Sequence, residues 1–316
     1  MTNTKELLLA GASVAVFVSV PLVLRSEYFL NLLVMFFLYV IVAQSWNLLG
    51  GVTGQISLGH SAFFGAGALA TRFLWVGKAP ILLAVAAGGV SSALLAAVIG
   101  VPCLRMRSAY FPIGTLALAM IAQTTIANIF PVPGSLSREF ISEYSLASRY
   151  YLALSVAVVT VLVVYLVTRS RVGLALVAIR DDEGAAEAMG VKTFRHKVLA
   201  LLVSTLFAGL GGGVFAYHQV SYYYEAPFDL SWAFLPTLAT FIGGLGTILG
   251  PIVGSLCFLA LSELFASFRD LHILISSFIF ILIVLFLPDG LMSVTRLARS
   301  RSPALASLRR GRQGPA

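Results

Sequence analysis

Three polar side chains stand among glycines in the first quarter of an otherwise apolar chain. Gln55, Ser57 and His60 lie within GGVTGQISLGHSAFFGAGALA, residues 50–70. Amide, hydroxyl and imidazole groups exchange hydrogen bonds with polar solutes, and glycine allows a helix to open, so this stretch could line a transport pathway. Close packing of helices around small residues is the alternative explanation for the glycines.

Two further features extend this candidate pathway. Thr115 and Gln123 are eight residues apart on one expected helix, which places them near the same face. A second glycine-interrupted segment, residues 243–255, reads GGLGTILGPIVGS and repeats the order Gly, Ile, Leu, Gly of the first. Glycine interruptions at corresponding places in two halves are typical of broken helices beside a substrate. The similarity does not establish an internal repeat.

Charge gathers in residues 169–197, which contain six Lys or Arg and four Asp or Glu. This segment is too charged to span lipid and too long for a turn. We interpret it as a structured cytoplasmic loop that meets a partner. Apolar residues recur at helical spacing before position 180, Asp181 or Asp182 can cap a second short helix, and Gly190 suits a left-handed helix end. An ordinary positive loop with an incidental helix is the alternative.

Several kinds of chemistry lack their usual motifs. The chain has no GxxxxGK[ST] phosphate loop, no HExxH, no CxxC and no close cluster of His, Cys and Asp, so it offers no metal site and no ATP site of that kind. Cys103 and Cys257 are interpreted as packing residues. The net charge of +8 resides in loops and the tail and does not indicate nucleic acid.

The acidic residues argue against a carrier that couples to ions. All of them except Glu263 fall in expected loops or at the ends of expected spans. Ion-coupled carriers usually keep ionisable groups inside the membrane. Glu263 is expected near the outer boundary, reaching headgroups or Arg269. Energy for active transport would therefore arrive through residues 169–197.

Composition indicates an all-α polytopic membrane protein, with 59% hydrophobic and 11% charged residues in 316. Spans need about 20 apolar residues. The ten candidate segments are 7–24, 28–49, 54–76, 80–101, 109–130, 150–168, 197–220, 232–249, 251–267 and 272–288.

Charge then predicts the orientation of these spans. With both termini cytoplasmic, 15 of the 21 Lys and Arg lie inside, as the positive-inside rule requires. Residues 1–295 would form the transmembrane domain. Residues 296–316 would form a basic, poorly ordered tail near anionic lipid. Tyr222, Tyr223, Tyr224 and Trp232 are expected in an interfacial aromatic belt.

Four blocks in order carry a family resemblance. They are SWNLLGGVTGQISLGHSAFFGAGA, LRMRSAYFPIGTLALAMI, the segment from RSRVGLALVAIRDDEGAAEAMG to VFA, and FIGGLGTILGPIVGS with a closing LPDGL. Together they resemble the permease subunits of branched-chain amino-acid ABC importers, from about Tyr39 to Leu291. Pro112 in YFPIG departs from the family pattern and is expected to kink its helix.

The resemblance implies a heteromeric importer of the bacterial inner membrane. Its partners would be a second permease subunit, two cytoplasmic ATPase subunits that bind the ATP, and a periplasmic substrate-binding protein. This chain would bind no cofactor and would not itself be an enzyme. By the same resemblance, the ATPase-coupling residues are Arg180, Asp181, Asp182, Glu183, Ala186, Glu187, Met189 and Gly190.

Two other functions remain open from the residues alone. One is a self-sufficient secondary transporter driven by an ion gradient, and the other is a channel for a small polar solute such as urea or an amide. Either would move solute without partners, whereas a permease subunit alone would be inert. The identity of the substrate is not encoded in any motif.

Overall fold

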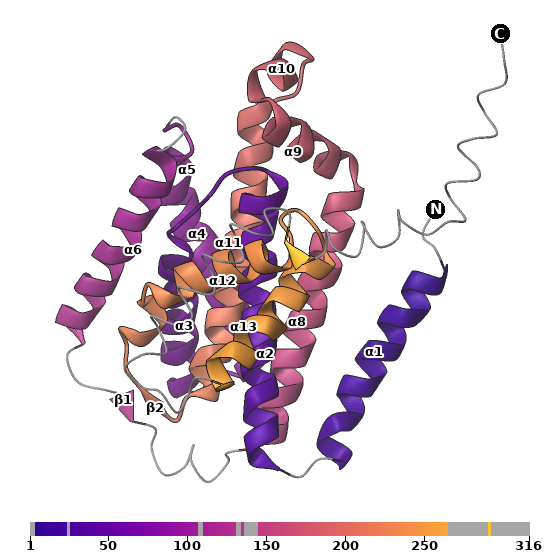
Figure 1. The fold of residues 1–316 in the computed structure, drawn as a ribbon. Helices are drawn as coiled ribbons and strands as arrows, with labels where there is room; N and C mark the ends of the chain where they lie inside the picture. Colours follow the sequence, from indigo (N-terminus) through magenta and orange to yellow (C-terminus); the bar gives the residue numbers. More distant parts are fainter. Residues whose placement is uncertain are drawn as a thin grey trace, which may run out of the picture.

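The computed structural model describes residues 4–23, 26–106, 110–130, 134–135, 145–264 and 290–291. Over these residues the chain is a bundle of helices with one pair of two-residue strands (Figure 1). The longer helices are α1 Thr4–Val23, α2 Glu27–Trp46, α3 His60–Val76, α4 Ile81–Leu95, α6 Tyr110–Ile129, α8 Leu146–Arg169, α11 Thr193–His218, α12 Ser231–Gly243 and α13 Leu249–Leu264.

The remaining elements are short and lie mostly at the two ends of the bundle. Helices α9 and α10 form one end, and the strand pair β1–β2 lies at the other (Figure 1). The short elements are η1 Asn47–Val52, η2 Ala96–Gly100, α5 Val101–Cys103, β1 Gly134–Ser135, α9 Arg171–Asp181, α10 Glu183–Ala188, β2 Ser221–Tyr222 and η3 Ala226–Phe228.

Five helical stretches in the described part of the chain are long and apolar enough to cross a membrane. They are Glu27–Val52, Ile81–Cys103, Tyr110–Ile129, Leu146–Arg169 and Thr193–His218. Shorter apolar helices cover Gly11–Val23, Ser231–Gly243 and Leu249–Leu264. Nine of the ten expected segments therefore contain helix. The tenth, 272–288, and the basic tail, 296–316, lie outside the described residues.

Two of the expected spans are interrupted at their glycines. Helix α2 widens into the π-helix η1, and regular helix resumes only at His60, so the expected span 54–76 begins six residues late. Helix α12 ends at Gly243 and α13 begins at Leu249, which divides the expected span 232–249. At 13 residues α12 is about 20 Å long, too short to cross a bilayer alone.

Small residues allow the central helix α11 to lie against its neighbours. A Cβ atom at Gly212 would collide with the carbonyl oxygen of Phe64, and one at Gly67 would collide with that of Gly209. Such close backbone approach is how helices associate in lipid, where apolar burial by itself does not favour one partner over another. Helix α11 consequently packs against α3, α4, α2 and α8.

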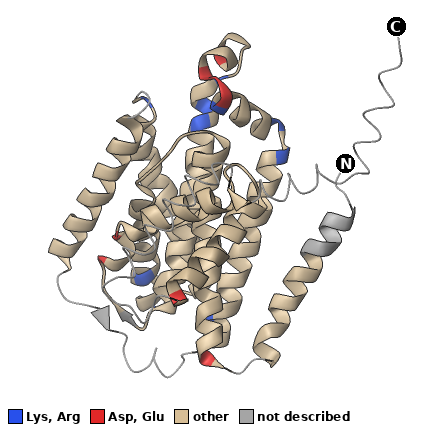
Figure 2. Ribbon diagram, viewed as in Figure 1, with Lys and Arg blue, Asp and Glu red and all other residues tan. Residues whose placement is uncertain are grey.

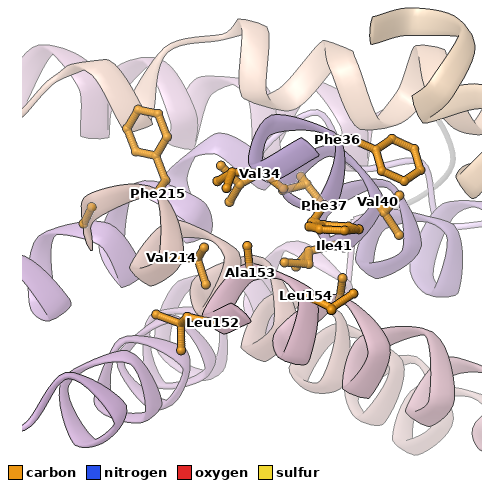
Figure 3. Close-up of a cluster of buried hydrophobic side chains, with 14 of the residues drawn as sticks. Val34, Phe36, Phe37, Val40, Ile41, Leu152, Ala153, Leu154, Val214 and Phe215 are labelled. Atoms are coloured by element: carbon orange, nitrogen blue, oxygen red, sulfur yellow. The ribbon is translucent and has the colours of Figure 1, made fainter. Parts of the chain in front are cut away.

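A second packing layer consists of large apolar side chains between α2, α8 and α11. Phe37 of α2 packs edge-on against Tyr150 of α8, with ring centroids 5.4 Å apart. Val214 and Phe215 of α11 belong to the same cluster, in which Figure 3 labels them together with Phe37. This apolar layer fixes α2, the helix that leads into the first glycine break.

Aromatic side chains at the β1–β2 end do not form the expected belt. Trp232 is buried and stacks on Phe64 with 4.2 Å between ring centroids, and Tyr222 is also buried. Only Tyr223 of this group is strongly exposed. The belt prediction is wrong for Trp232 and Tyr222 because both rings pack inside the bundle, Trp232 on Phe64 and Tyr222 beneath the guanidinium of Arg72.

Candidate functional site

The two glycine breaks meet at one junction, and Asn47 holds them together. The Asn47 amide nitrogen donates to the carbonyl of Thr247 (2.9 Å), and its oxygen accepts from the backbone N–H of Gly246 (2.9 Å). One turn earlier on α2, the Gln44 amide donates to the carbonyl of Ile248. Backbone groups left without helical partners at the second break are thus satisfied by side chains beside the first.

Arg180 brings the charged segment to the same junction. Its Nη1 donates to the carbonyl oxygen of Gly51 at 3.0 Å. A Cβ atom on Gly246 would lie 2.7 Å from that Nη1, and one on Gly54 would lie 2.8 Å from Arg180 Cγ. Both glycines have positive φ, 70° and 77°, which side-chain-bearing residues rarely adopt. The end of α9 is therefore in contact with both breaks.

The charged segment is structured largely as its sequence suggested. Ser170 caps α9, and its hydroxyl accepts from the N–H of Gly173 and of the preceding residue. The carboxylate of Asp182 caps α10 by accepting from the N–H of Ala185 at 3.0 Å. Gly190 adopts φ 87° after α10, as expected for a left-handed helix end. Two short helices, each with its own side-chain cap, make this segment rigid.

One face of α9–α10 packs on the bundle and the other is exposed. Gly173, Leu176 and Ile179 are buried, and Glu183 forms a 2.6 Å ion pair with Lys197, which is nearly buried. Leu174 and Met189 point outward with exposed fractions of 72% and 86%. Figure 2 shows acidic and basic residues concentrated at this end of the bundle.

The coupling residues inferred from the sequence divide between these two faces. Ala186 lies on the buried side of α10, and the Arg180 side chain, although 39% exposed, reaches the two breaks. Asp181, Glu187, Met189 and Gly190 are exposed, with Asp181 beside the Arg180 guanidinium.

Three of the predicted pathway residues, Ser57, His60 and Thr115, lie close together, and their side chains form hydrogen bonds with other groups of the protein. His60 and Ser57 are fully buried, and Nδ1 of His60 lies 3.2 Å from Ser57 Oγ. Thr115 is buried too, and its hydroxyl oxygen accepts from the backbone N–H of Leu58 at 3.1 Å. The Thr115 bond holds the non-helical residues 53–59 against α6, and His60 links them to α11 through Ser204, whose Oγ lies 2.9 Å from Nε2 of His60.

Gln55 and Gln123 lie apart from that cluster. Gln55 is partly exposed, and its backbone N–H donates to the carbonyl of Leu49. Gln123 is two turns beyond Thr115 and donates to the carboxylate of Asp229 at 3.3 Å. Pro112 lies in the first turn of α6, where a missing N–H breaks no helical bond, so the helix accepts it without the expected kink.

Buried arginines are a feature that sequence reasoning missed. Arg72 is 2% exposed and donates to carbonyls at the end of α11, among them Gln219 at 3.1 Å. Arg149, which falls between the expected spans 109–130 and 150–168, is 1% exposed and donates to the carbonyl of Tyr217 at 2.7 Å. Cations at a helix C-terminus meet its partial negative charge. For Arg72 the signal available was an arginine within an apolar span, which is rare without a partner. Arg149 lies outside the expected spans and gave no such signal.

Glu263 also has a partner that its sequence position did not suggest. The Tyr28 hydroxyl at the start of α2 donates to its carboxylate. Arg269, the partner considered from the sequence, lies outside the described residues. Both cysteines are free and partly buried, in α5 and α13.

Comparison with known proteins gives consistent matches over most of the chain. A family model described as branched-chain amino acid transport system, permease component, matches residues 28–287. A high-affinity branched-chain amino acid transport system permease protein LivM from Salmonella typhimurium is 24% identical over 331 residues, covering 93% of this chain and 77% of the relative. The LivM protein of Escherichia coli is 25% identical over 295 residues, covering 82% of this chain and 68% of the relative.

Proposed function

We propose that this chain, which belongs to the permease component family of branched-chain amino acid transport systems, moves branched-chain or related amino acids across the bacterial inner membrane. It is a multi-pass membrane protein and a component of an ABC transport complex, and such a subunit is not catalytic. We further propose that its partners in this complex are an external binding protein, a second permease subunit and two cytoplasmic ATPase subunits.

The observation that carries this proposal is the α9–α10 segment. It is capped at both helices, packed on the bundle by one face and exposed by the other, and its Arg180 contacts both glycine breaks. A rigid segment that contacts both a partner and the broken helices can transmit the movement of the partner to those helices. A passive channel does not need a segment of this kind.

The orientation follows from the distribution of charge. Six of the 21 Lys and Arg lie in residues 169–197, and the positive-inside rule favours the cytoplasm for that end of the bundle. The α9–α10 end would then meet the ATPases, and the β1–β2 end would meet the binding protein.

Reconstitution tests the function. The purified chain alone in proteoliposomes should not move radiolabelled leucine, isoleucine or valine, with or without an ion gradient. Addition of the second permease, the ATPases and the binding protein should produce ATP-dependent uptake. Transport by the chain alone would instead establish an autonomous carrier or channel.

The docking surface needs a test that spares the fold. Because Glu183 pairs with the nearly buried Lys197, reversing its charge would disturb packing as well as docking. Glu187→Lys and Met189→Asp alter exposed positions on α10 and just after it. They should reduce copurification of the ATPase subunits, whereas Glu225→Lys at the β1–β2 end should not. Equal loss in all three variants would contradict this docking surface.

A further inference from the structure

Arg180 is the side chain through which the charged segment touches both interruptions in the helices. We propose that Arg180 is a positioning residue that transmits movement of α9–α10 to the junction of the two glycine breaks. This inference rests on the proposed function, since it assigns one residue to the coupling between partner and permease. It adds a specific connection inside the chain that no docking surface by itself supplies.

Arg180 meets a backbone carbonyl at the end of η1. Gly51 is the next-to-last residue of η1, so its carbonyl is among those that a helix end leaves without an internal partner. The Arg180 Nη1 donates to that carbonyl at 3.0 Å. A charged donor makes a stronger hydrogen bond than a neutral one, and a cation also meets the negative end of the helix dipole. The bond therefore joins α9 firmly to the end of α2–η1.

Two glycines, one from each break, lie close to the Arg180 side chain. Gly54 and Gly246 face its side chain from the two breaks, and any Cβ atom there would lie within 3 Å of Arg180 atoms. The Arg180 side chain, which is 39% exposed, therefore lies against the backbone of both breaks. A movement of α9 that displaces this side chain would change its contacts with both glycines.

The two breaks are also joined to each other. Asn47, in the first turn of η1, holds both Gly246 and Thr247 through its side-chain amide. A continuous path of hydrogen bonds thus runs from α9 through Arg180, Gly51 and η1 to the turn between α12 and α13. The π-helical form of η1 suits this role, because such segments are less regular than α-helix and recur at functional sites.

The decisive measurement is substrate moved per ATP hydrolysed, in proteoliposomes that contain the full complex. Arg180→Ala should leave assembly and ATP hydrolysis in place and lower that ratio about fivefold or more, the low end of typical coupling between sites. Arg180→Lys should give a ratio between those of the wild type and Arg180→Ala, since an ammonium group can reach the Gly51 carbonyl but lacks the planar, multiple-donor geometry of a guanidinium. Arg171→Ala, an exposed arginine at the start of α9, is the matched control and should retain the wild-type ratio.

A second measurement does not depend on transport. In a Cys103→Ala, Cys257→Ala background, Ile56→Cys places a thiol at an exposed position in the first break. Trapping the ATPases with ATP and vanadate should change its rate of labelling when Arg180 is present and leave it unchanged in Arg180→Ala. If the wild-type complex moves no amino acid yet shows this response, the proposed function fails while the role of Arg180 stands.

Clear results would overturn the inference. A wild-type transport ratio together with a wild-type labelling response in Arg180→Ala would show that the arginine transmits nothing. If Arg180→Ala does not assemble, Arg180→Lys and Arg180→Gln decide by the same two measurements. Variants that assemble with both readouts unchanged would reduce Arg180 to an anchor for its loop.

Discussion

His60 Nε2 lies 2.9 Å from the hydroxyl oxygen of Ser204, a hydrogen bond that joins the start of α3 to the middle of α11. Because the Ser204 hydroxyl donates to the carbonyl of Ser45 at 2.6 Å, Nε2 carries the proton and donates to Ser204. Nδ1 then accepts from Ser57. One imidazole therefore connects the non-helical residues 53–59 to two helices of the core.

Removing this imidazole should destabilise the chain. His60→Ala leaves the buried hydroxyls of Ser57 and Ser204 each without one partner, and we expect a loss of about 1–3 kcal/mol in the free energy of unfolding. A double-mutant cycle with Ser204→Ala should give a coupling energy of about 0.6 kcal/mol, typical of hydrogen bonds between membrane helices. Denaturant titration in detergent measures both quantities. His196→Ala, at a partly buried histidine near the start of α11 whose Nδ1 lies 2.9 Å from the carbonyl of Lys192, should cost less.

Asn47→Asp tests the link between the two breaks. A carboxylate can still accept a hydrogen bond from the N–H of Gly246 but cannot donate one to the carbonyl of Thr247. One of its oxygens would instead face that carbonyl oxygen, and both are acceptors. We expect a loss of about 1–3 kcal/mol in stability, from the unmet buried carbonyl, and a fall in uptake. Thermal unfolding of the purified chain measures the first and transport assays the second. A loss no greater than that of Asn128→Asp, at an exposed site on α6, would contradict the link.

Gly212→Ala tests the close approach of α11 to α3. The added Cβ would collide with the carbonyl oxygen of Phe64, so the helices must separate, at a cost of about 1–3 kcal/mol. Gly11→Ala is the matched substitution in α1, where nothing lies within 4 Å of the added atom. Its effect should be neutral or stabilising, because alanine favours helix. Comparing the two thermal unfolding temperatures separates packing from helix propensity.

The cap of α10 can be removed without touching its exposed face. Asp182→Ala removes the acceptor for Ala185 N–H and should destabilise this helix by about 1 kcal/mol. The change should lower copurification of the ATPase subunits, while Asp182→Asn, which retains an acceptor, should preserve it. Glu225→Ala, at the β1–β2 end of the bundle, is the control and should leave copurification unchanged. Equal binding by all three variants would mean that α10 does not dock.

Local features of the site could be predicted because they depend on neighbouring residues. Asp182 as a helix cap and Gly190 as a left-handed end both follow from groups within a few positions. The interruptions after Gly50 and Gly243 were marked by runs of glycine. Apolar length alone located nine helices within the described residues.

Long-range contacts could not be predicted in the same way. Arg180 and Gly51 are separated by 129 positions, and His60 and Ser204 by 144. No local rule pairs such residues. The buried Trp232 was assigned to a membrane interface for the same reason, since its partner Phe64 lies far away in the chain.

The sequence by itself determined that this chain belongs in a membrane, where its helices break, and that residues 169–197 form a capped, charged structure. Only the tertiary structure decided that the two breaks meet, that Arg180 reaches them, and which side of each helix is inside. The physical reason is that lipid is as apolar as a protein interior, so hydrophobicity identifies a span without indicating its buried face. Backbone approach at glycines and hydrogen bonds between distant polar groups make that choice, and they exist only once the helices are packed.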